Sequence, residues 1–222
     1  MPGTPFVFPN DRTRTTVIGR TGTGKTQAGV WLLSHASYDR RPWIVFDYKR
    51  DELLNAIPFA ERMDVTDKVP KHPGIYLVGL HPSESEQAED LMNRIWEREG
   101  VGVFVDEGLM VQRGSDAYQA VLTQGRSKSI PVITLIQRPF NVNRCALSEA
   151  NYFMVFEISD RQDKKRVEEF TPLDMDRSLP GEFYSWWYDA KRKYTCKLRP
   201  VPDASTILDT FYERLRQPRR VI

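Results

Sequence analysis

Cysteine and histidine are scarce in this chain of 222 residues, which contains two cysteines and three histidines. Cys145 and Cys196 lack the close spacing of a metal-ligand or redox pair, so we expect a reducing compartment. His35, His72 and His81 are scattered along the chain, and this distribution argues against a zinc site. Functions that depend on zinc, metal clusters or disulfides therefore have no support in the sequence.

Long apolar segments are also missing. No apolar run approaches the roughly 18 residues that a membrane-spanning helix requires, so we expect no membrane span. The first residues lack the basic and then apolar pattern of a secretory signal. Hydrophobic residues nevertheless make up 40% of the chain and charged residues 28%, proportions typical of a globular domain with a sizeable core.

A large excess of charge of either sign is absent as well, because the formal net charge is +2. Basic residues do gather near the C-terminus, in two groups at positions 191–199 and 214–220. Such clusters can bind nucleic acid, but they can equally form a solvated face of the protein. The sequence leaves both interpretations open.

The most regular pattern that is present is an alternation of apolar and amphipathic segments. The expected strands lie at 15–19, 42–48, 74–80, 101–107, 131–137 and 151–158. Stretches of helical character, such as 83–99 and 116–128, separate most of them. Apolar strands that alternate with helices predict an α/β fold whose mainly parallel sheet is covered on both faces. We expect a single domain over 1–222, with its core at about 14–170.

The segment after this core has a different pattern. Residues 181–198 alternate in polarity and turn near Asp189–Ala190, which predicts an antiparallel hairpin at the edge of the sheet. Residues 204–217 predict a terminal helix, with Ser205 or Thr206 as its cap. The predicted hairpin and helix together occupy about 180–217.

The stretch VIGRTGTGKTQAGV, residues 17–30, carries the most informative motif. It matches G-x-x-x-x-G-K-[ST], the P-loop, between a predicted strand and a predicted helix. The glycines allow a turn whose backbone N–H groups converge on a phosphate, and the helix directs its partly positive N-terminus there. Lys25 is expected to reach the β- and γ-phosphates of ATP, and the Thr26 hydroxyl to bind Mg²⁺. The predicted nucleotide-binding residues are Gly19, Arg20, Thr21, Gly22, Thr23, Gly24, Lys25 and Thr26.

Two further predicted strands end in residues that suit ATP hydrolysis. Asp106 is expected to be the Walker B carboxylate that orders Mg²⁺, and Glu107 to activate or orient a water for attack on the γ-phosphate. Gln137 can donate a hydrogen bond to the phosphate and accept one from that water. An ordinary acidic turn and a plain strand exit are the alternatives. Glu107 favours hydrolysis over a small-molecule kinase, which has no need to activate water.

Four segments, in this order, resemble the FtsK–HerA superfamily of DNA-pumping ATPases: VIGRTGTGKT, IVFDYKRDE, VFVDEG and QGRSKSIPVITLIQRP. The resemblance covers about residues 14–170. It implies a RecA-like P-loop NTPase fold, a three-layer sandwich with sheet order 5-1-4-3-2. It also implies a homo-hexameric ring around double-stranded DNA, which is contacted without regard to its sequence.

Within the superfamily, the chain is similar to the genome-packaging ATPases of icosahedral viruses with an internal membrane. This similarity implies an ATP-hydrolysing motor that translocates double-stranded DNA into a preformed capsid, with capsid vertex or portal proteins as partners. Its location would be the host cytoplasm and then a virion vertex. A filament-assembly ATPase is one alternative, although such proteins usually carry a membrane span. A nucleotide-gated assembly or adaptor protein is another, although it would not need Glu107 and Gln137.

The same resemblance suggests roles for residues outside the P-loop. Arg126 would reach the nucleotide of a neighbouring subunit and stabilise charge on the transferring phosphoryl group, unless it is a plain surface charge. Arg138 is the second candidate for this role. Asp47 and Lys49 match the family's second strand and would lie at the nucleotide edge or at a subunit contact. Arg113, in the stretch MVQRGSDAY, is the candidate for DNA contact, with an exposed loop residue as the alternative.

Aromatic residues are concentrated in the predicted hairpin. They are Phe183, Tyr184, Trp186, Trp187 and Tyr188. Aromatic side chains can stack on nucleic-acid bases, but alternating aromatics in an edge hairpin favour packing in the core or between subunits.

Overall fold

The computed structural model describes residues 6–108, 110–111 and 114–216. In this part of the chain, strands form one sheet in the order β3-β4-β2-β5-β6-β1-β7-β8-β9. The strands are β1 (Arg14–Ile18), β2 (Pro42–Asp47), β3 (Glu61–Arg62), β4 (Gly74–Gly79), β5 (Gly102–Asp106), β6 (Val132–Ile136), β7 (Tyr152–Val155), β8 (Ser185–Asp189) and β9 (Tyr194–Leu198). The α-helices are α1 (Lys25–Ser34), α2 (Glu52–Asn55), α3 (Ser85–Arg98), α4 (Asp116–Gln124), α5 (Cys145–Ser148), α6 (Arg161–Glu168) and α7 (Ala204–Arg216). Two short 3₁₀ helices are η1 (Pro82–Glu84) and η2 (Pro139–Asn141).

The centre of the sheet confirms the predicted fold class and refines the strand order. The strands β7-β1-β6-β5-β2 are parallel neighbours, and numbered along the chain they give 5-1-4-3-2. The complete order is longer than the resemblance implied, because β4 pairs with the outer edge of β2 and β3 pairs with β4. The six expected strands all form, and the short β3 was not predicted.

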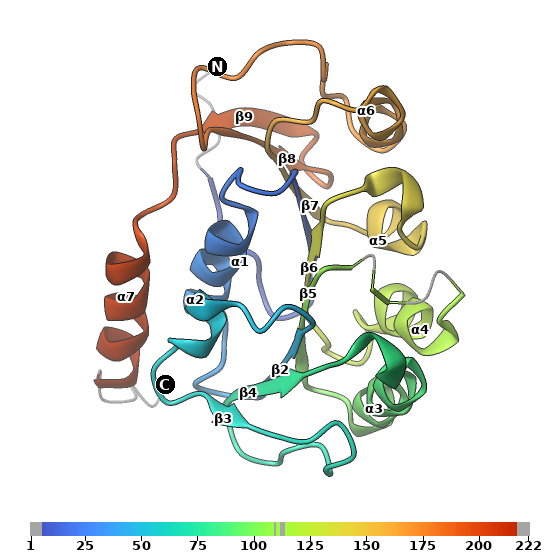
Figure 1. Cartoon of the computed structure of the whole chain (residues 1–222), viewed down its shortest axis with the longest axis vertical. Helices are drawn as coiled ribbons and strands as arrows, with labels where there is room; N and C mark the ends of the chain where they lie inside the picture. Colours follow the sequence, from blue (N-terminus) through green and yellow to red (C-terminus); the bar gives the residue numbers. More distant parts are fainter. Residues whose placement is uncertain (1–5, 109, 112–113, 217–222) are drawn as a thin grey trace.

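Helices cover both faces of the sheet, which makes three layers (Figure 1). The helices α1, α2 and α7 lie on one side, and α3, α4, α5 and α6 lie on the other. Every residue of β1, β2, β5 and β6 is buried, and adjacent residues such as Val17 and Ile18 pack into opposite core clusters. Full burial of such a side chain contributes about 1.5–3 kcal/mol, so this double coverage explains the continuously apolar strands.

The hairpin predicted near the C-terminus is present as β8 and β9, with β8 antiparallel to β7. Trp187 is buried and stacks on Tyr152, with ring centroids 5.1 Å apart, and Trp186 is also buried. These two tryptophans therefore belong to the core. Phe183, by contrast, is exposed.

The terminal helix α7 packs on α1. The proposed cap residues were wrong, because the helix begins at Ala204 and the carboxylate of Asp203 accepts the Thr206 N–H at 2.8 Å. An N-cap residue must precede the first turn, and Ser205 and Thr206 lie inside that turn.

No helix in the described residues is long and apolar enough to cross a bilayer.

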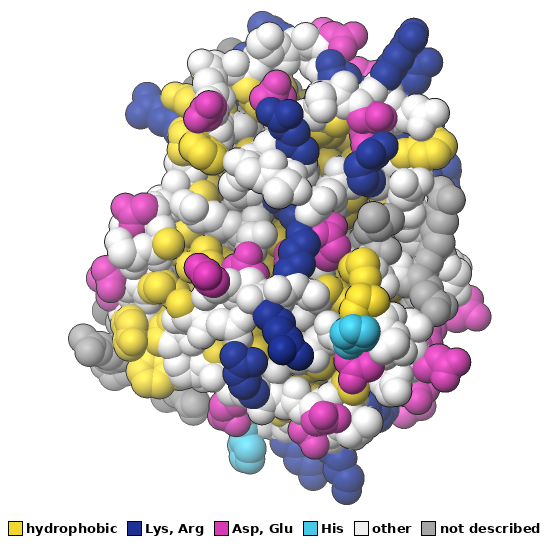
Figure 2. Space-filling view, viewed as in Figure 1, with side chains coloured by type: hydrophobic (Ala, Val, Ile, Leu, Met, Phe, Trp, Pro, Cys, Tyr) yellow, Lys and Arg dark blue, Asp and Glu magenta, His cyan; other side chains and the backbone are white. Residues whose placement is uncertain are grey.

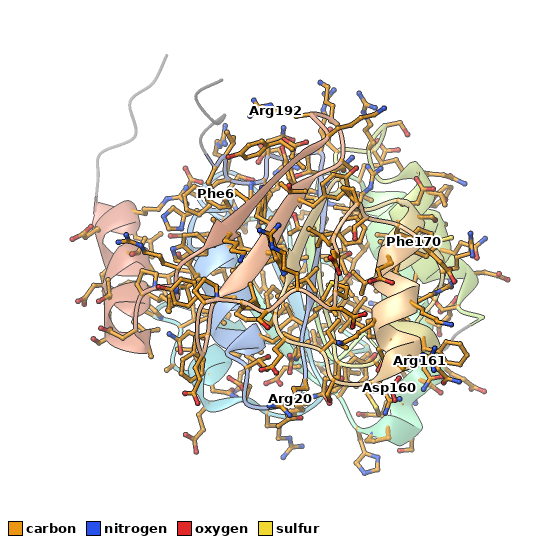
Figure 3. All side chains as sticks on the ribbon, turned by 90° about the horizontal axis from the view of Figure 1, so that it is seen from above. Phe6, Arg20, Asp160, Arg161, Phe170 and Arg192 are labelled. Atoms are coloured by element: carbon orange, nitrogen blue, oxygen red, sulfur yellow. The ribbon has the colours of Figure 1, made fainter. Side chains whose placement is uncertain are left out.

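All carboxyl ends of the parallel strands meet on one side of the molecule. Figure 3 places Arg20, which follows β1, on the same side as Asp160, and Arg192 in the β8–β9 turn on the opposite side. Seen as in Figure 1, the Arg20 side faces the viewer. This is the side of an open parallel sheet on which α/β proteins bind ligands.

Candidate nucleotide and hydrolysis site

The loop between β1 and α1 has the geometry of a phosphate cradle. Gly22 and Gly24 have φ angles of 84° and 87°, in the left-handed region that other residues rarely adopt. The Thr23 hydroxyl donates to the Arg20 carbonyl at 2.8 Å, and the Ala28 N–H donates to the Gly24 carbonyl at 2.9 Å, so α1 starts directly at the loop. A Cβ on Gly19 would lie 2.5 Å from the Thr23 hydroxyl oxygen. The loop therefore needs its glycines for conformation and for space.

Lys25, the first residue of α1, is buried with only 4% of its surface exposed. Burial and the neighbouring charge of Lys49 lower the pKa of Lys25, while the carboxylates of Asp106 and Glu107 act in the opposite direction. A buried ammonium group is stable only with compensating negative charge. The position of Lys25 thus supports its predicted contact with phosphates.

Asp106, the last residue of β5, is completely buried, and neither of its carboxylate oxygens has a hydrogen-bond partner among the described residues. Burial raises the pKa of Asp106 to about 6, against the opposing charges of Lys25 and Lys49. Buried carboxylates normally have partners, so these two oxygens suit a cation or its bound waters. No group of three or more His, Cys, Asp or Glu side chains in the described residues forms a metal site alone. A Mg²⁺ ion here would need phosphate oxygens and the half-buried Thr26 as further ligands.

Glu107 follows β5 with a φ of 69°, a conformation that is unusual for a residue other than glycine. Its Oε2 accepts a hydrogen bond from Gln137 Nε2 at 2.7 Å and forms an ion pair with Lys49 Nζ. Its buried Oε1 has no partner in the part of the chain that the structure describes. Such strained backbone costs on the order of 1–3 kcal/mol and is concentrated at functional sites.

Gln137 connects the two halves of the site. Its amide donates to Glu107, and its Oε1 accepts from the Thr21 hydroxyl at 3.4 Å. The residues predicted from the P-loop, the Walker B strand and the following strand are therefore adjacent in space. A single amide links the carboxylate of Glu107 to the P-loop.

The sequence did not predict the contact of Lys49 with Glu107. In the sheet, Asp47 of β2 lies beside Asp106 of β5, so the residues after both strands are neighbours. Asp47 itself accepts from the backbone N–H groups of Lys49 and Asp51 at 3.2 and 3.1 Å. It therefore shapes the turn that carries Lys49.

Two of the three predicted arginines, Arg126 and Arg138, are not part of this cluster. Arg126 follows α4 and is exposed. It lies close enough to Arg14 for its charge to contribute to lowering the pKa of Arg14. Arg126 is therefore at the amino ends of the strands, away from the P-loop of its own chain. Arg138 pairs with Asp163 at 2.6 Å and Asp160 at 3.4 Å, so its charge is engaged within the subunit. Arg113 lies outside the described residues.

Positive side chains extend along the middle of the face that carries the P-loop, as Figure 2 shows. Acidic side chains lie among and beside them on the same face (Figure 2). Together, the loop, the unpartnered Asp106 and the Glu107–Gln137 pair define a P-loop ATPase.

Comparisons with known proteins agree with this class. No protein-family profile matches the sequence. The chain is 38% identical over 216 residues to the DNA packaging ATPase P9 of Enterobacteria phage PRD1. The aligned region covers 92% of this chain and 94% of P9. The chain therefore belongs to the DNA packaging ATPase family that P9 represents, which confirms the resemblance found in the sequence.

Solved structures support the fold. The genome packaging NTPase B204 of Sulfolobus turreted icosahedral virus 2, in complex with ATPγS, is similar with a TM-score of 0.67 and 14% identity over 87% of this chain and all of B204. ATPases 2 and 3 of EccC from Thermomonospora curvata give a TM-score of 0.60 with 14% identity, over 86% of this chain and 37% of that one.

Proposed function

We propose that this protein is an ATP-hydrolysing motor that translocates double-stranded DNA into a preformed viral capsid. The observation that carries the proposal is the strained, buried Glu107, which Gln137 links directly to the P-loop. This arrangement suits a water-activating carboxylate. The similarity to P9 supplies the DNA and the capsid as the expected substrate and partner.

Mg²⁺ bound with the nucleotide would neutralise phosphate charge, with Thr26 and Asp106 as the residues to hold it. The backbone N–H groups of the loop and the Lys25 ammonium would bind and orient the phosphates. The Glu107 carboxylate would orient the attacking water and accept its proton, while Gln137 and Lys49 hold the carboxylate in place.

We also propose that the subunits form a homo-hexameric ring around DNA of any sequence. Support comes from Arg126, which is exposed and remote from its own P-loop, so it is available to a neighbouring subunit. An arginine supplied in this way can accelerate hydrolysis about 10³- to 10⁵-fold, which would couple turnover to ring assembly. Capsid vertex or portal proteins would anchor the ring, first in the host cytoplasm and then at a virion vertex.

The test is steady-state ATP hydrolysis by the full chain, with and without double-stranded DNA, over a range of protein concentrations. We expect turnover to rise with DNA and steeply with concentration, and Glu107→Gln to reduce it by about 10²- to 10⁴-fold. Glu99→Gln is the matched control, because Glu99 also has a positive φ, 57°, and pairs with a lysine, Lys128. A slow rate of ATP hydrolysis that changes neither with DNA nor with either substitution would instead favour a nucleotide-gated assembly protein.

A further inference from the structure

A cavity lies beside the P-loop, on the side away from Glu107. Its volume is about 200 Å³. Residues 20–23 of the P-loop line one part of it, Phe156 and Glu157 after β7 line another, and residues 181–184 before β8 line the rest, together with Leu179. The cavity is thus continuous with the proposed phosphate site.

Phe183 is the unusual residue in this cavity. It has a φ of 61°, which is strained for a bulky side chain, and half of its surface is exposed. Its ring atom Cδ1 lies 3.2 Å from the position that a Cβ on Gly24 would occupy, so the ring lies against the P-loop. The nearby Trp186 and Trp187 are buried in the core clusters, whereas Phe183 belongs to neither cluster. Strained backbone conformations are concentrated at functional sites, and this one borders a cavity beside the phosphate-binding loop.

The strand order gives a nucleotide one direction in this site. Glu107 and Gln137 follow β5 and β6, so the γ-phosphate must lie on that side of the P-loop. The strand β1 lies between β6 and β7. The nucleoside end of a triphosphate therefore extends toward β7, where Phe156 and Glu157 border the cavity.

We propose that this cavity binds the nucleobase of the bound nucleotide, with the ring of Phe183 stacked on the base. The inference rests on the proposed ATPase function and specifies how that site holds its substrate. Stacking uses the face of the base, which every base offers, so Phe183 supplies affinity for the base more than selection among bases.

The experiment compares two ligands that differ by the nucleoside and are not hydrolysed, Mg²⁺·ADP and Mg²⁺·pyrophosphate, by calorimetric titration of the full chain. We expect Phe183→Leu to weaken ADP binding about tenfold and to leave pyrophosphate binding unchanged. Phe183→Trp, which keeps an aromatic ring, should retain ADP affinity. Phe59→Leu is the matched control, since Phe59 is also exposed, 67%, with a φ of 62°.

Three results would overturn the inference alone. In the first, Phe183→Leu leaves ADP binding intact. In the second, it weakens ADP and pyrophosphate binding equally, which would mean that Phe183 acts only through the shape of the P-loop. In the third, it weakens binding of double-stranded DNA and not of ADP, which would make Phe183 a DNA contact. A wild-type chain that binds neither ligand would overturn the proposed function as well.

Discussion

Two glutamates in this protein have similar backbone conformations and each pairs with a different lysine, but only one of them belongs to the candidate site. Glu99 and Glu107 both have positive φ angles, 57° and 69°. Glu99 is the C-cap residue that follows α3, and its side chain is 54% exposed and pairs with Lys128 at 2.6 Å. The Glu107 side chain is 8% exposed and pairs with Lys49, and its Oε1 has no partner among the described residues. A positive φ angle by itself therefore does not indicate a functional residue. A positive φ angle in a buried carboxylate with an unpartnered oxygen does indicate one.

The same contrast separates two buried aspartates. Asp163 accepts from the Phe140 N–H at 3.0 Å and pairs with Arg138 at 2.6 Å. Asp106 is buried just as deeply, yet neither oxygen has a partner in the described part of the chain. Satisfied carboxylates stabilise a fold, whereas an unsatisfied one lowers stability in exchange for ligand binding.

The largest effect that this contrast predicts concerns the free energy of unfolding, which Asp106→Asn should increase and Asp163→Asn should decrease. Raising the pKa of Asp106 from 3.8 to about 6 means that its ionisation destabilises the folded, ligand-free protein by about 3 kcal/mol above pH 6. Asp106→Asn should remove much of this cost at pH 7 while abolishing hydrolysis. Asp163→Asn should lower the free energy of unfolding by about 1–3 kcal/mol, because Arg138 would lose a charged partner.

Urea unfolding without nucleotide or Mg²⁺ measures both variants. The stabilisation by Asp106→Asn should shrink as the pH falls from 6 and vanish below about pH 4, where the wild-type carboxyl is protonated in both folded and unfolded states. A gain that is constant with pH would mean that charge at Asp106 is not its cause.

A smaller effect is expected from the two lysines. Lys49→Met should lower kcat about tenfold with a much smaller change in KM, since Glu107 would lose one of the two groups that hold it. Lys128→Met, at the exposed pair, should leave kcat unchanged. Steady-state kinetics at saturating DNA measure kcat and KM of both variants. An equal decrease of kcat in the two variants would show that Lys49 has no specific role in positioning Glu107.

The smallest effect concerns the exposed pair itself. Glu99→Gln should change the free energy of unfolding by less than about 1 kcal/mol, because exposed ion pairs contribute little. Lys128 also lies over the Trp96 ring, 3.9 Å from its centroid, so Lys128→Met should cost slightly more than Glu99→Gln. Thermal unfolding of both variants measures this difference, and a larger loss in Glu99→Gln would show that the ion pair outweighs the ring contact.

Local patterns predicted most of the fold. The apolar run at 42–48 and the run at 101–107 form β2 and β5 almost residue for residue, because a strand covered on both faces must be apolar throughout. The alternating segment after the core forms the β8–β9 hairpin for the complementary reason, that an edge strand such as β9 is half exposed. The two-residue β3 carries too little pattern to be predicted.

By itself, the sequence determined the P-loop motif, the residues that end β5 and β6, and the succession of strands and helices. These features depend on neighbours along the chain. Only the tertiary structure decided that Lys49 pairs with Glu107 and that Phe183 lies against Gly24. Such contacts depend on which strand ends lie side by side in the sheet, and this order comes from the packing of helices on its two faces, which no local pattern records.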